Sequence, residues 1–354
     1  MFKFVGLIST SLVMIMLSTH TAYAASKTTT PLFKDDEVLK VKIIAPFKTL
    51  TARAQKSTDP YEATLSVDDP AKSETHAISL SARGVSRRSK ELCDFPPLRV
   101  EFSEKPGDTS LFDGQKRLKL VTHCKRSERF QQYYLLEYTA YRLYNLMTPR
   151  SLKVRMAEIT YIEEKTGKER LTRLGFFIED IDDAAARNGL EEIEVDDIAR
   201  NQIAPSQAGP YAVFQYMIGN LDWSMHSGPD GDDCCHNTKL IGAPIDNSFE
   251  ITPVPYDFDY SGLVDAPYAA PPDSVRVRNV RQRRFRGFCA HNEETMAAAK
   301  ALRARKAEFL TVIEQTKGMR DAARLKAANY LESFFDAIET DEKIEKNLLS
   351  DCRS

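Results

Sequence analysis

Three polar side chains follow one another in apolar settings between residues 220 and 262, in the order Asp222, Asn237 and Asp257. Phosphoryl transfer needs such a set: one carboxylate accepts or orients the proton of the attacking hydroxyl. An Asn oxygen and a second carboxylate then hold magnesium against the phosphates. Taken alone, each residue would more often cap a turn. The ordered set is more specific than any of its members.

Upstream, a lysine and a glutamate form a second candidate pair. Lys119 alternates with Leu118 and Leu120 in an expected strand, and Glu137 lies in an expected helix that is apolar on two sides. An unpaired buried carboxylate is costly, so Glu137 should have a cation nearby. A strand lysine with a helix glutamate is how kinases hold the α- and β-phosphates. An ordinary structural ion pair, or a solvent-exposed pair with Arg142, is the alternative.

The elements that carry these residues can be read from hydrophobic periodicity and turn signals. Strands are expected at 38–47, 63–67, 78–82, 98–102, 118–122, 154–162 and 171–178. Helices are expected from the N-cap Ser127 to 147, at 181–190 and 210–221, and from 292 to about 349. The order predicts an α+β protein without βαβ alternation. Its domains would be a β-rich N-lobe with one long helix (25–180) and a mainly helical C-lobe carrying the catalytic and metal motifs (181–354).

Composition and the first residues predict an exported protein. Residues 1–24 have the pattern of a signal peptide, with Lys3, an apolar run at 5–17 and an A-x-A site at 22–24, although an uncleaved anchor is the alternative. No later run approaches the ~20 apolar residues of a membrane span. Lys and Arg number 49 against 51 Asp and Glu, a balance that gives no bulk attraction to nucleic acid. We therefore expect a periplasmic or secreted protein without a nucleic-acid partner.

An exported chain with an even number of cysteines is expected to form disulfides. The six are Cys93, Cys124, Cys234, Cys235, Cys289 and Cys352. Cys93 precedes one expected strand and Cys124 follows the next, so antiparallel pairing predicts a disulfide between them. We also expect one of Cys234 and Cys235 to pair with Cys289 or Cys352. Zinc is the alternative, but the Cys and His spacings match no standard zinc site.

The order of these motifs resembles the CotH kinase family over residues 78–262. The resemblance rests on Arg83-Gly84-Val85-Ser86, on Leu118-Lys119-Leu120 before a helix, on the segment 175–179, and on the motifs around Asp222 and Asp257. It implies an exported atypical kinase with a two-lobed, protein-kinase-like fold that uses ATP and Mg²⁺ or Mn²⁺.

The resemblance also implies roles for individual residues. Asp222 would be the catalytic aspartate, Asn237 and Asp257 the metal ligands, and Asp259 an assisting ligand. Nucleotide-binding residues would be Arg83, Gly84 and Ser86, Lys119 with Glu137 as its ion-pair partner, and a hinge at 177–179 that includes Ile178 and Glu179. Two features depart from the pattern: a classical glycine-rich loop is missing, and the long gap after Asp222 leaves Asn220 or Asn247 as alternatives to Asn237.

The sequence thus predicts transfer of phosphate from Mg–ATP to a hydroxyl, with a protein as the favoured acceptor. Transfer of AMP, a small-molecule kinase, and an inactive binding or scaffold module of the cell envelope are the alternatives. His226 or His236 could act as a base. The arginines of segment 275–286 could bind an acidic or phosphorylated substrate, or could form a solvated linker. The oligomeric state cannot be predicted from these patterns.

Overall fold

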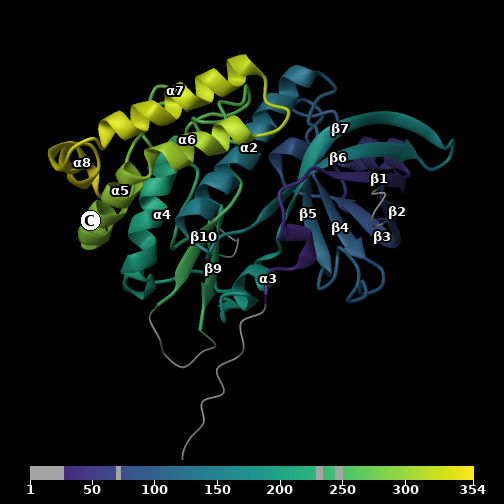
Figure 1. Ribbon diagram of the computed structural model, residues 1–354, viewed down its shortest axis with the longest axis horizontal. Coiled ribbons are helices and arrows are strands. Elements are labelled where there is room, and N and C mark those ends of the chain that lie inside the picture. The colour runs from purple at the N-terminus through teal and green to yellow at the C-terminus, as the bar shows by residue number, and fades with distance from the viewer. Residues whose placement is uncertain (1–27, 69–72, 229–233, 244–249) are drawn as a thin grey trace, which may run out of the picture.

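Seven strands close into a β-barrel, and most of the helices pack on one side of it (Figure 1). The computed structural model describes residues 28–68, 73–228, 234–243 and 250–354. Over these ranges the protein has a barrel-containing α+β fold. The predicted signal peptide, residues 1–24, and Asn247 lie outside the described residues.

The barrel strands all fall within residues 39–178. They are β1 (Leu39–Ala45), β2 (Tyr61–Val67), β3 (Glu74–Ala82), β4 (Leu98–Phe102), β5 (Arg117–Val121), β6 (Val154–Glu163) and β7 (Lys168–Ile178). Around the barrel their order is β1, β2, β3, β4, β5, β7, β6. Neighbours are antiparallel except at the closure, where β1 pairs in parallel with β6. Closure removes the free edges that an open sheet would expose.

The predicted two-lobed, protein-kinase-like fold, with a β-rich N-lobe and a mainly helical C-lobe, is wrong because the strands close on themselves. The deciding contact is the parallel ladder of β1 and β6, which sets Leu39 opposite Ala157. Alternation of apolar and polar residues indicates where a strand is, but it does not say which distant strand is its partner. The closure was therefore outside the reach of the sequence patterns.

The alternation of strand residues divides the barrel into an interior and an outer surface. In β5, Leu118 and Leu120 are buried in the interior cluster, which also contains Val100 and Phe177. Lys119 stands between the two leucines and therefore points to the opposite face. This register places a lysine outside the barrel, on the side of the second sheet.

Helix α2 (Glu128–Met147) connects the barrel to the remaining helices. It contacts β6 and β7 on one side and α4 and α6 on the other. Ser127 is its N-cap, as its sequence predicts, and accepts a hydrogen bond from the Arg129 N–H at 3.3 Å. The other helices are α1 (Phe47–Arg53), α3 (Ile181–Ala186), α4 (Pro205–Ile218), α5 (Asn292–Ala304), α6 (Lys306–Gln315), α7 (Asp321–Ala337) and α8 (Asp341–Asn347).

A small antiparallel sheet lies between the barrel and the helices. Its strands, in spatial order, are β10 (Thr252–Pro255), β9 (Thr238–Gly242) and β8 (Glu191–Glu192). All four β10 residues and most of β9 are buried. This burial fixes the ends of the two strands, where the candidate site residues lie.

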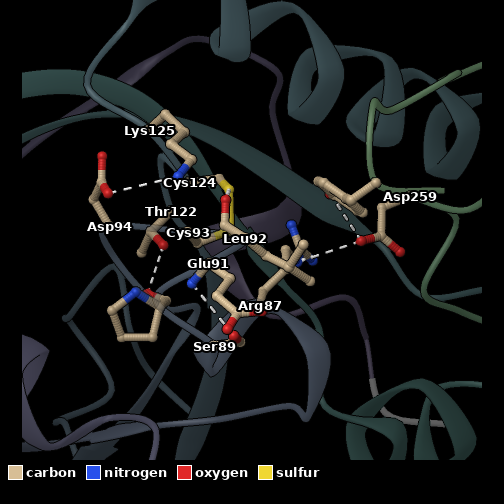
Figure 2. The surroundings of a disulfide bond; sticks show 12 residues. Arg87, Ser89, Glu91, Leu92, Cys93, Asp94, Thr122, Cys124, Lys125 and Asp259 are labelled. Atoms are coloured by element: carbon tan, nitrogen blue, oxygen red, sulfur yellow. Dashed lines mark hydrogen bonds and ion pairs between the residues drawn. A yellow bond between two sulfur atoms is a disulfide. The ribbon is translucent and has the colours of Figure 1, made fainter.

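All six cysteines form disulfides. Cys93 pairs with Cys124, as the strand argument predicts (Figure 2). The other prediction is wrong: Cys234 pairs with its neighbour Cys235, and Cys289 pairs with Cys352. With every thiol oxidised, cysteine ligands for the alternative zinc site are not available. Among the described residues, no helix combines the length and the apolar character needed to cross a bilayer.

One histidine is enclosed by the aromatic part of the barrel core. The His123 ring centroid lies 4.4 Å from that of Phe95 and 5.1 Å from that of Tyr161. Its side chain is 2 % exposed, and its buried Nδ1 has no hydrogen-bond partner among the described residues. Burial lowers the pKa of His123 to about 3, and nearby Arg173 acts in the same direction.

This burial predicts a specific pH dependence of stability. Below its ordinary pKa near 6.5 the unfolded chain gains a proton on His123 that the folded protein does not accept until about pH 3, so stability falls on acidification. At pH 5 the loss should be about 2 kcal/mol. The melting temperature of the His123→Phe variant, measured relative to that of the wild type, should therefore be higher at pH 5 than at pH 8. Parallel curves for the two proteins would contradict this prediction.

Candidate functional site

The register of β9 and β10 brings Asn237 and Asp257 together. Thr238 faces Pro255 in the ladder, so Asn237 directly precedes β9 where Tyr256 and Asp257 leave β10. The Tyr256 N–H donates to the Asn237 carbonyl at 3.1 Å. Asn237 and Asp257 both have positive φ angles, 51° and 62°. Asn and Asp tolerate this left-handed region better than most residues, which suits these types to the two turns.

Asp222 joins this pair from the segment that follows α4. Its Oδ1 lies 2.7 Å from His236 Nε2, and its Oδ2 accepts from Asn237 Nδ2 at 3.0 Å. The hydrogen bond to Asp222 raises the pKa of His236. Asn220 uses its Oδ1 to accept the Asp222 N–H at 3.0 Å and is 1 % exposed, so it shapes the turn and does not face the site. Asp222, Asn237 and Asp257, which follow one another in the sequence motif, therefore lie close together in space.

The side-chain amide of Asn237 has a defined orientation. Its Nδ2 donates to the Asp222 carbonyl at 2.7 Å as well as to the Asp222 carboxylate. The amide oxygen is then directed away from Asp222 and receives no hydrogen bond from the described residues. Asp257 beside it is partly exposed. An amide oxygen and a carboxylate are ligands suited to Mg²⁺, which usually completes its shell with water and phosphate. No group of three or more His, Cys, Asp or Glu suited to a metal occurs among the described residues.

A buried ion cluster is centred on Arg87, and Figure 2 shows Arg87 with Asp259. Arg87 reaches Glu137 at 3.2 Å, Asp259 at 3.4 Å and Asp257 at 3.8 Å. The expected Lys119–Glu137 ion pair is therefore wrong, because the cation beside Glu137 is Arg87. Asp259 is also engaged: it accepts from the Tyr268 hydroxyl at 3.0 Å and is 4 % exposed. We correct its assignment from an assisting metal ligand to a member of this cluster.

The charged groups of the cluster shift one another's pKa values. Burial alone would lower the pKa of Arg87, but Glu137 and Asp259 raise it well above its usual value. Burial raises the pKa of Glu137 even though Arg87 opposes the shift. Burial likewise raises the pKa of Asp259 to about 8, again against Arg87. Arg87 is thus a permanent charge, and in the described ranges it is the only cation within ion-pair distance of Glu137, Asp257 and Asp259.

Two further cations face the site without a carboxylate partner. Lys119 Nζ lies 4.7 Å from the centroid of the Tyr256 ring, and burial, with Arg83 acting in the same direction, lowers the pKa of Lys119 to about 8. Burial also lowers the pKa of Arg83, and Asp257 opposes the shift. Within the described part of the chain, the buried Nε of Arg83 has no hydrogen-bond partner. Among the described residues, neither cation has a carboxylate within ion-pair distance, so both charges are available to an anion.

The segment that carries Arg83 turns sharply before Arg87. Gly84 has a φ of 76°, which favours glycine, and Val85 at the tip is 86 % exposed. Ser86 begins the short 3-10 turn that carries Arg87. The disulfide between Cys93 and Cys124 ties down the end of the same connection. Arg83 and Arg87 are therefore positioned by one turn, while Gly84 and Ser86 serve its geometry.

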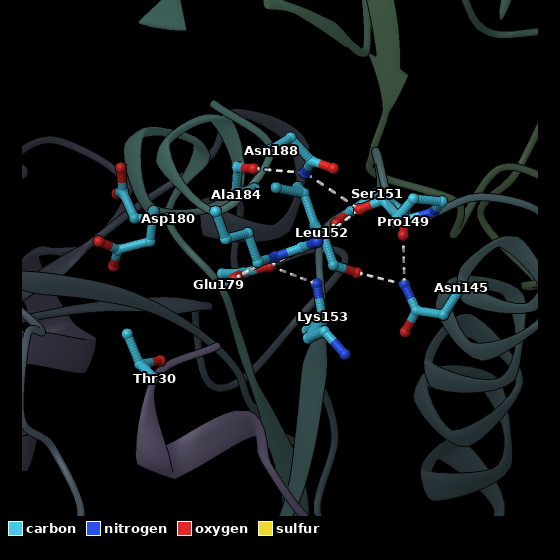
Figure 3. A network of polar contacts seen from close by, with 12 residues as sticks. Thr30, Asn145, Pro149, Ser151, Leu152, Lys153, Glu179, Asp180, Ala184 and Asn188 are labelled. Atoms are coloured by element: carbon cyan, nitrogen blue, oxygen red, sulfur yellow. Dashed lines mark hydrogen bonds and ion pairs between the residues drawn. The ribbon is translucent and has the colours of Figure 1, made fainter. Parts of the chain in front are cut away.

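The predicted hinge residues do not face a ligand. Glu179 is 1 % exposed, pairs with Arg187 at 2.9 Å and accepts the Lys153 N–H at 2.9 Å. Figure 3 shows Glu179 within this polar network. Ile178 is 2 % exposed and lies opposite Lys119 in the β5–β7 ladder. We therefore correct both residues to structural ones: Ile178 pairs with the strand position of Lys119, and Glu179 binds Arg187 and the Lys153 N–H.

Two hollows adjoin the site. One lies on the Lys119 side and is lined by Arg99, Arg117, Leu118, Lys119, Asp180, Ile181, Glu192, Glu194 and Lys239. The other is a shallow groove beside the catalytic candidate, lined by Leu221, Asp222, Trp223, Ser224, Ser227, Gly228, His236, Pro272, Ser274 and Arg286. A donor and an acceptor could thus approach from different sides.

One residue of the site, Arg87, was not singled out from the sequence. Arg87 was missed although a buried Glu137 demanded a cation, because Arg83, Arg87, Arg88 and Lys119 were all available by type. His236, one of two bases considered, is the one that contacts Asp222, whereas His226 packs against Phe288.

The arginines of segment 275–286 are mostly engaged within the protein. Arg281, Arg283, Arg284 and Arg286 bind protein groups. Arg276 and Arg278 are exposed.

No protein-family model matches the chain, and no curated protein matches it either. The resemblance to the CotH kinase family stays a prediction from the motifs.

The cluster predicts different effects on stability for the substitution of Arg87 and for that of Lys119. Arg87→Met leaves Glu137 and Asp259 buried without their cation and should lower the free energy of unfolding by about 3–5 kcal/mol. Lys119→Met removes a desolvated charge that has no ion pair, so stability should be unchanged or raised. Chemical denaturation of both variants measures the difference. A larger loss for Lys119→Met would show that Lys119 neutralises Glu137 after all.

Proposed function

We propose that this chain transfers a phosphoryl group from Mg–ATP to a hydroxyl group, with a protein as the acceptor. The observation that carries the proposal is the arrangement of charges around Asp257. The negative charge of Asp257 acts on Arg83 and Lys119, two cations without a carboxylate within ion-pair distance among the described residues. Asn237, at the neighbouring strand end, donates to Asp222. Such a set offers groups for an anion site, for a cation site and for a base.

The cations would bind the phosphates of the nucleotide. Burial lowers the pKa of Lys119, and the positive charge of Arg83 acts in the same direction. A bound polyphosphate offsets the charge of Arg83 and restores the ordinary affinity of Lys119 for its proton. Lys119 is held for this purpose by the β5–β7 ladder and by the Tyr256 ring.

The metal would be held by Asn237 and Asp257. Bound Mg²⁺ or Mn²⁺ would supply charge neutralisation for the phosphate oxygens. Two protein ligands with phosphate oxygens and water are the usual arrangement for Mg²⁺ in phosphoryl transfer. The amide orientation imposed by Asp222 leaves the Asn237 oxygen for this role.

Asp222 would act on the acceptor hydroxyl. Its carboxylate already binds His236 and Asn237, and each carboxylate oxygen has a further lone pair for a substrate hydroxyl. The proton moves from the hydroxyl to Asp222 as the hydroxyl oxygen bonds to the γ-phosphorus and the bond from that phosphorus to ADP breaks. His236, whose Nε2 lies 2.7 Å from the Asp222 carboxylate, orients that carboxylate.

The groove beside Asp222 favours a protein acceptor. It is shallow and includes Pro272, Ser274 and Gly228 along its walls. Small-molecule sites are concave and surround most of the ligand, whereas an extended peptide segment needs only one open wall.

The test uses ATP labelled at either the γ- or the α-phosphate, with an extract of envelope proteins and a serine- and threonine-containing peptide mixture as acceptors. Transfer of the γ-label with Mg²⁺ or Mn²⁺ supports the proposal. Asp222→Asn should lower transfer by about 10²- to 10⁴-fold and keep nucleotide binding. Asp257→Asn should lose the metal-dependent thermal shift, which is about 2.7 kcal/mol of stabilisation at a hundredfold excess over Kd.

Asp265→Asn is the matched control, because Asp265 also has a positive φ and pairs with Arg281 and Lys326, which are not residues of the site. It should behave as wild type. Transfer of the α-label would replace the proposal with AMP transfer. Metal-dependent nucleotide binding without transfer of either label would favour a binding module, and no binding at all would contradict the proposal.

A further inference from the structure

The segment that carries Asp222 has an unusual set of hydrogen bonds. Residues 220–224 belong to no helix or strand, yet four consecutive backbone carbonyls accept from side chains. Trp223 Nε1 donates to the Asn220 carbonyl at 2.9 Å, and Asn237 Nδ2 donates to that of Asp222 at 2.7 Å. Arg286 donates to the carbonyls of Leu221 and of Trp223. The conformation of this loop therefore depends on side chains brought to it from elsewhere.

Arg286 binds on both sides of Asp222. Its Nη1 is 3.1 Å from the Trp223 carbonyl and also contacts the Leu221 carbonyl, and its guanidinium lies 5.0 Å from the centroid of the Trp223 ring. Burial lowers the pKa of Arg286 to about 10, and among the described residues no carboxylate is within ion-pair distance of it. The guanidinium of Arg286 is partly buried, and its hydrogen-bond partners are backbone carbonyls of the Asp222 loop instead of a carboxylate.

The C-terminus of the described chain holds Arg286 in place. The Arg353 N–H donates to the Gly287 carbonyl at 2.8 Å, and the Cys289 N–H donates to the Arg353 carbonyl at 2.9 Å. The disulfide of Cys289 and Cys352 closes this connection. Gly287 allows close packing, because a Cβ there would lie 2.9 Å from the Cβ of Ala212 on α4. The segment that delivers Arg286 is thus anchored on both sides.

We propose that Arg286 is a positioning residue for Asp222. By fixing the carbonyls before and after Asp222, it sets the direction in which the carboxylate leaves the backbone. This inference rests on the proposed function, in which Asp222 receives the proton of the acceptor. Catalytic groups must be held within a fraction of an ångström of their productive geometry, so loosening this loop should slow transfer without weakening nucleotide binding.

The same segment offers a matched control. Arg283 also donates to backbone carbonyls, those of Met217 at 3.2 Å and Tyr330 at 2.6 Å, and lies over the Tyr330 ring. Its contacts are on the α4 and α7 helices and do not include the Asp222 loop. Arg283→Lys and Arg286→Lys therefore each replace a guanidinium that donates to backbone carbonyls. Only Arg286 donates to the loop that carries Asp222.

The experiment compares both lysine variants and Arg286→Gln with the wild-type protein. Three quantities are measured: kcat and the nucleotide KM for labelled transfer, deuterium uptake of the peptide containing residues 219–225, and acrylamide quenching of Trp223, the only tryptophan in the chain. Arg286→Lys should lower kcat at least about tenfold with the nucleotide KM unchanged, and deuterium uptake and quenching should rise. Arg286→Gln should give larger changes of the same kind.

Arg283→Lys should match the wild type in all three quantities, whatever its melting temperature. The proposal is overturned if the Arg286 variants exchange deuterium and quench like Arg283→Lys, or if their kcat equals that of the wild type. If the wild-type protein transfers no label, phosphoryl transfer fails as the function. In that case the exchange and quenching comparison still decides whether Arg286 orders the loop.

Discussion

The site depends on the buried ion pairs made by the guanidinium of Arg87. Arg87 comes from the connection between β3 and β4, and it binds Glu137 on α2 and Asp259 after β10. Three parts of the chain that are far apart in sequence therefore meet at one buried cation. Removal of either the cation or a carboxylate should destabilise the fold, because the remaining charges would be buried without partners. The Cys93–Cys124 disulfide holds the connection that carries Arg87.

Because Arg87 neutralises Glu137, Lys119 and Arg83 are not needed for that purpose. Their burial lowers the pKa of each, and no described carboxylate lies within ion-pair distance of them. A folded protein that keeps two such charges side by side sacrifices stability at this place, as binding sites commonly do. On our account the missing partner is the polyphosphate, with Asp257 and Asn237 opposite for its metal. The clamp on the Asp222 loop adds the third component, a carboxylate of fixed direction.

Patterns in the sequence could predict contacts made by neighbouring strands and turns. The disulfide of Cys93 and Cys124 follows from two adjacent strands that the patterns locate. The pairing of β9 with β10, which brings Asn237 and Asp257 together, was not among the predicted strand pairs. Barrel closure could not be predicted, because the β1–β6 ladder joins distant segments. Burial of Glu137 required a cation, but residue types alone did not distinguish Arg87 from Lys119. The kinase-like fold was wrong because the barrel closes through distant strands. The Lys119–Glu137 ion pair was wrong because several cations were equally suitable by residue type.

The most direct test of this account is a crystal structure of the protein with Mn²⁺ and a non-hydrolysable ATP analogue, with anomalous scattering used to locate the metal. The account predicts one manganese peak bound by the Asn237 amide oxygen and the Asp257 carboxylate. The phosphates should contact Lys119 and Arg83, and the γ-phosphate should face Asp222. A nucleotide bound elsewhere, or phosphates that leave Lys119 and Arg83 without contact, would contradict the central claim that these two charges form the anion site.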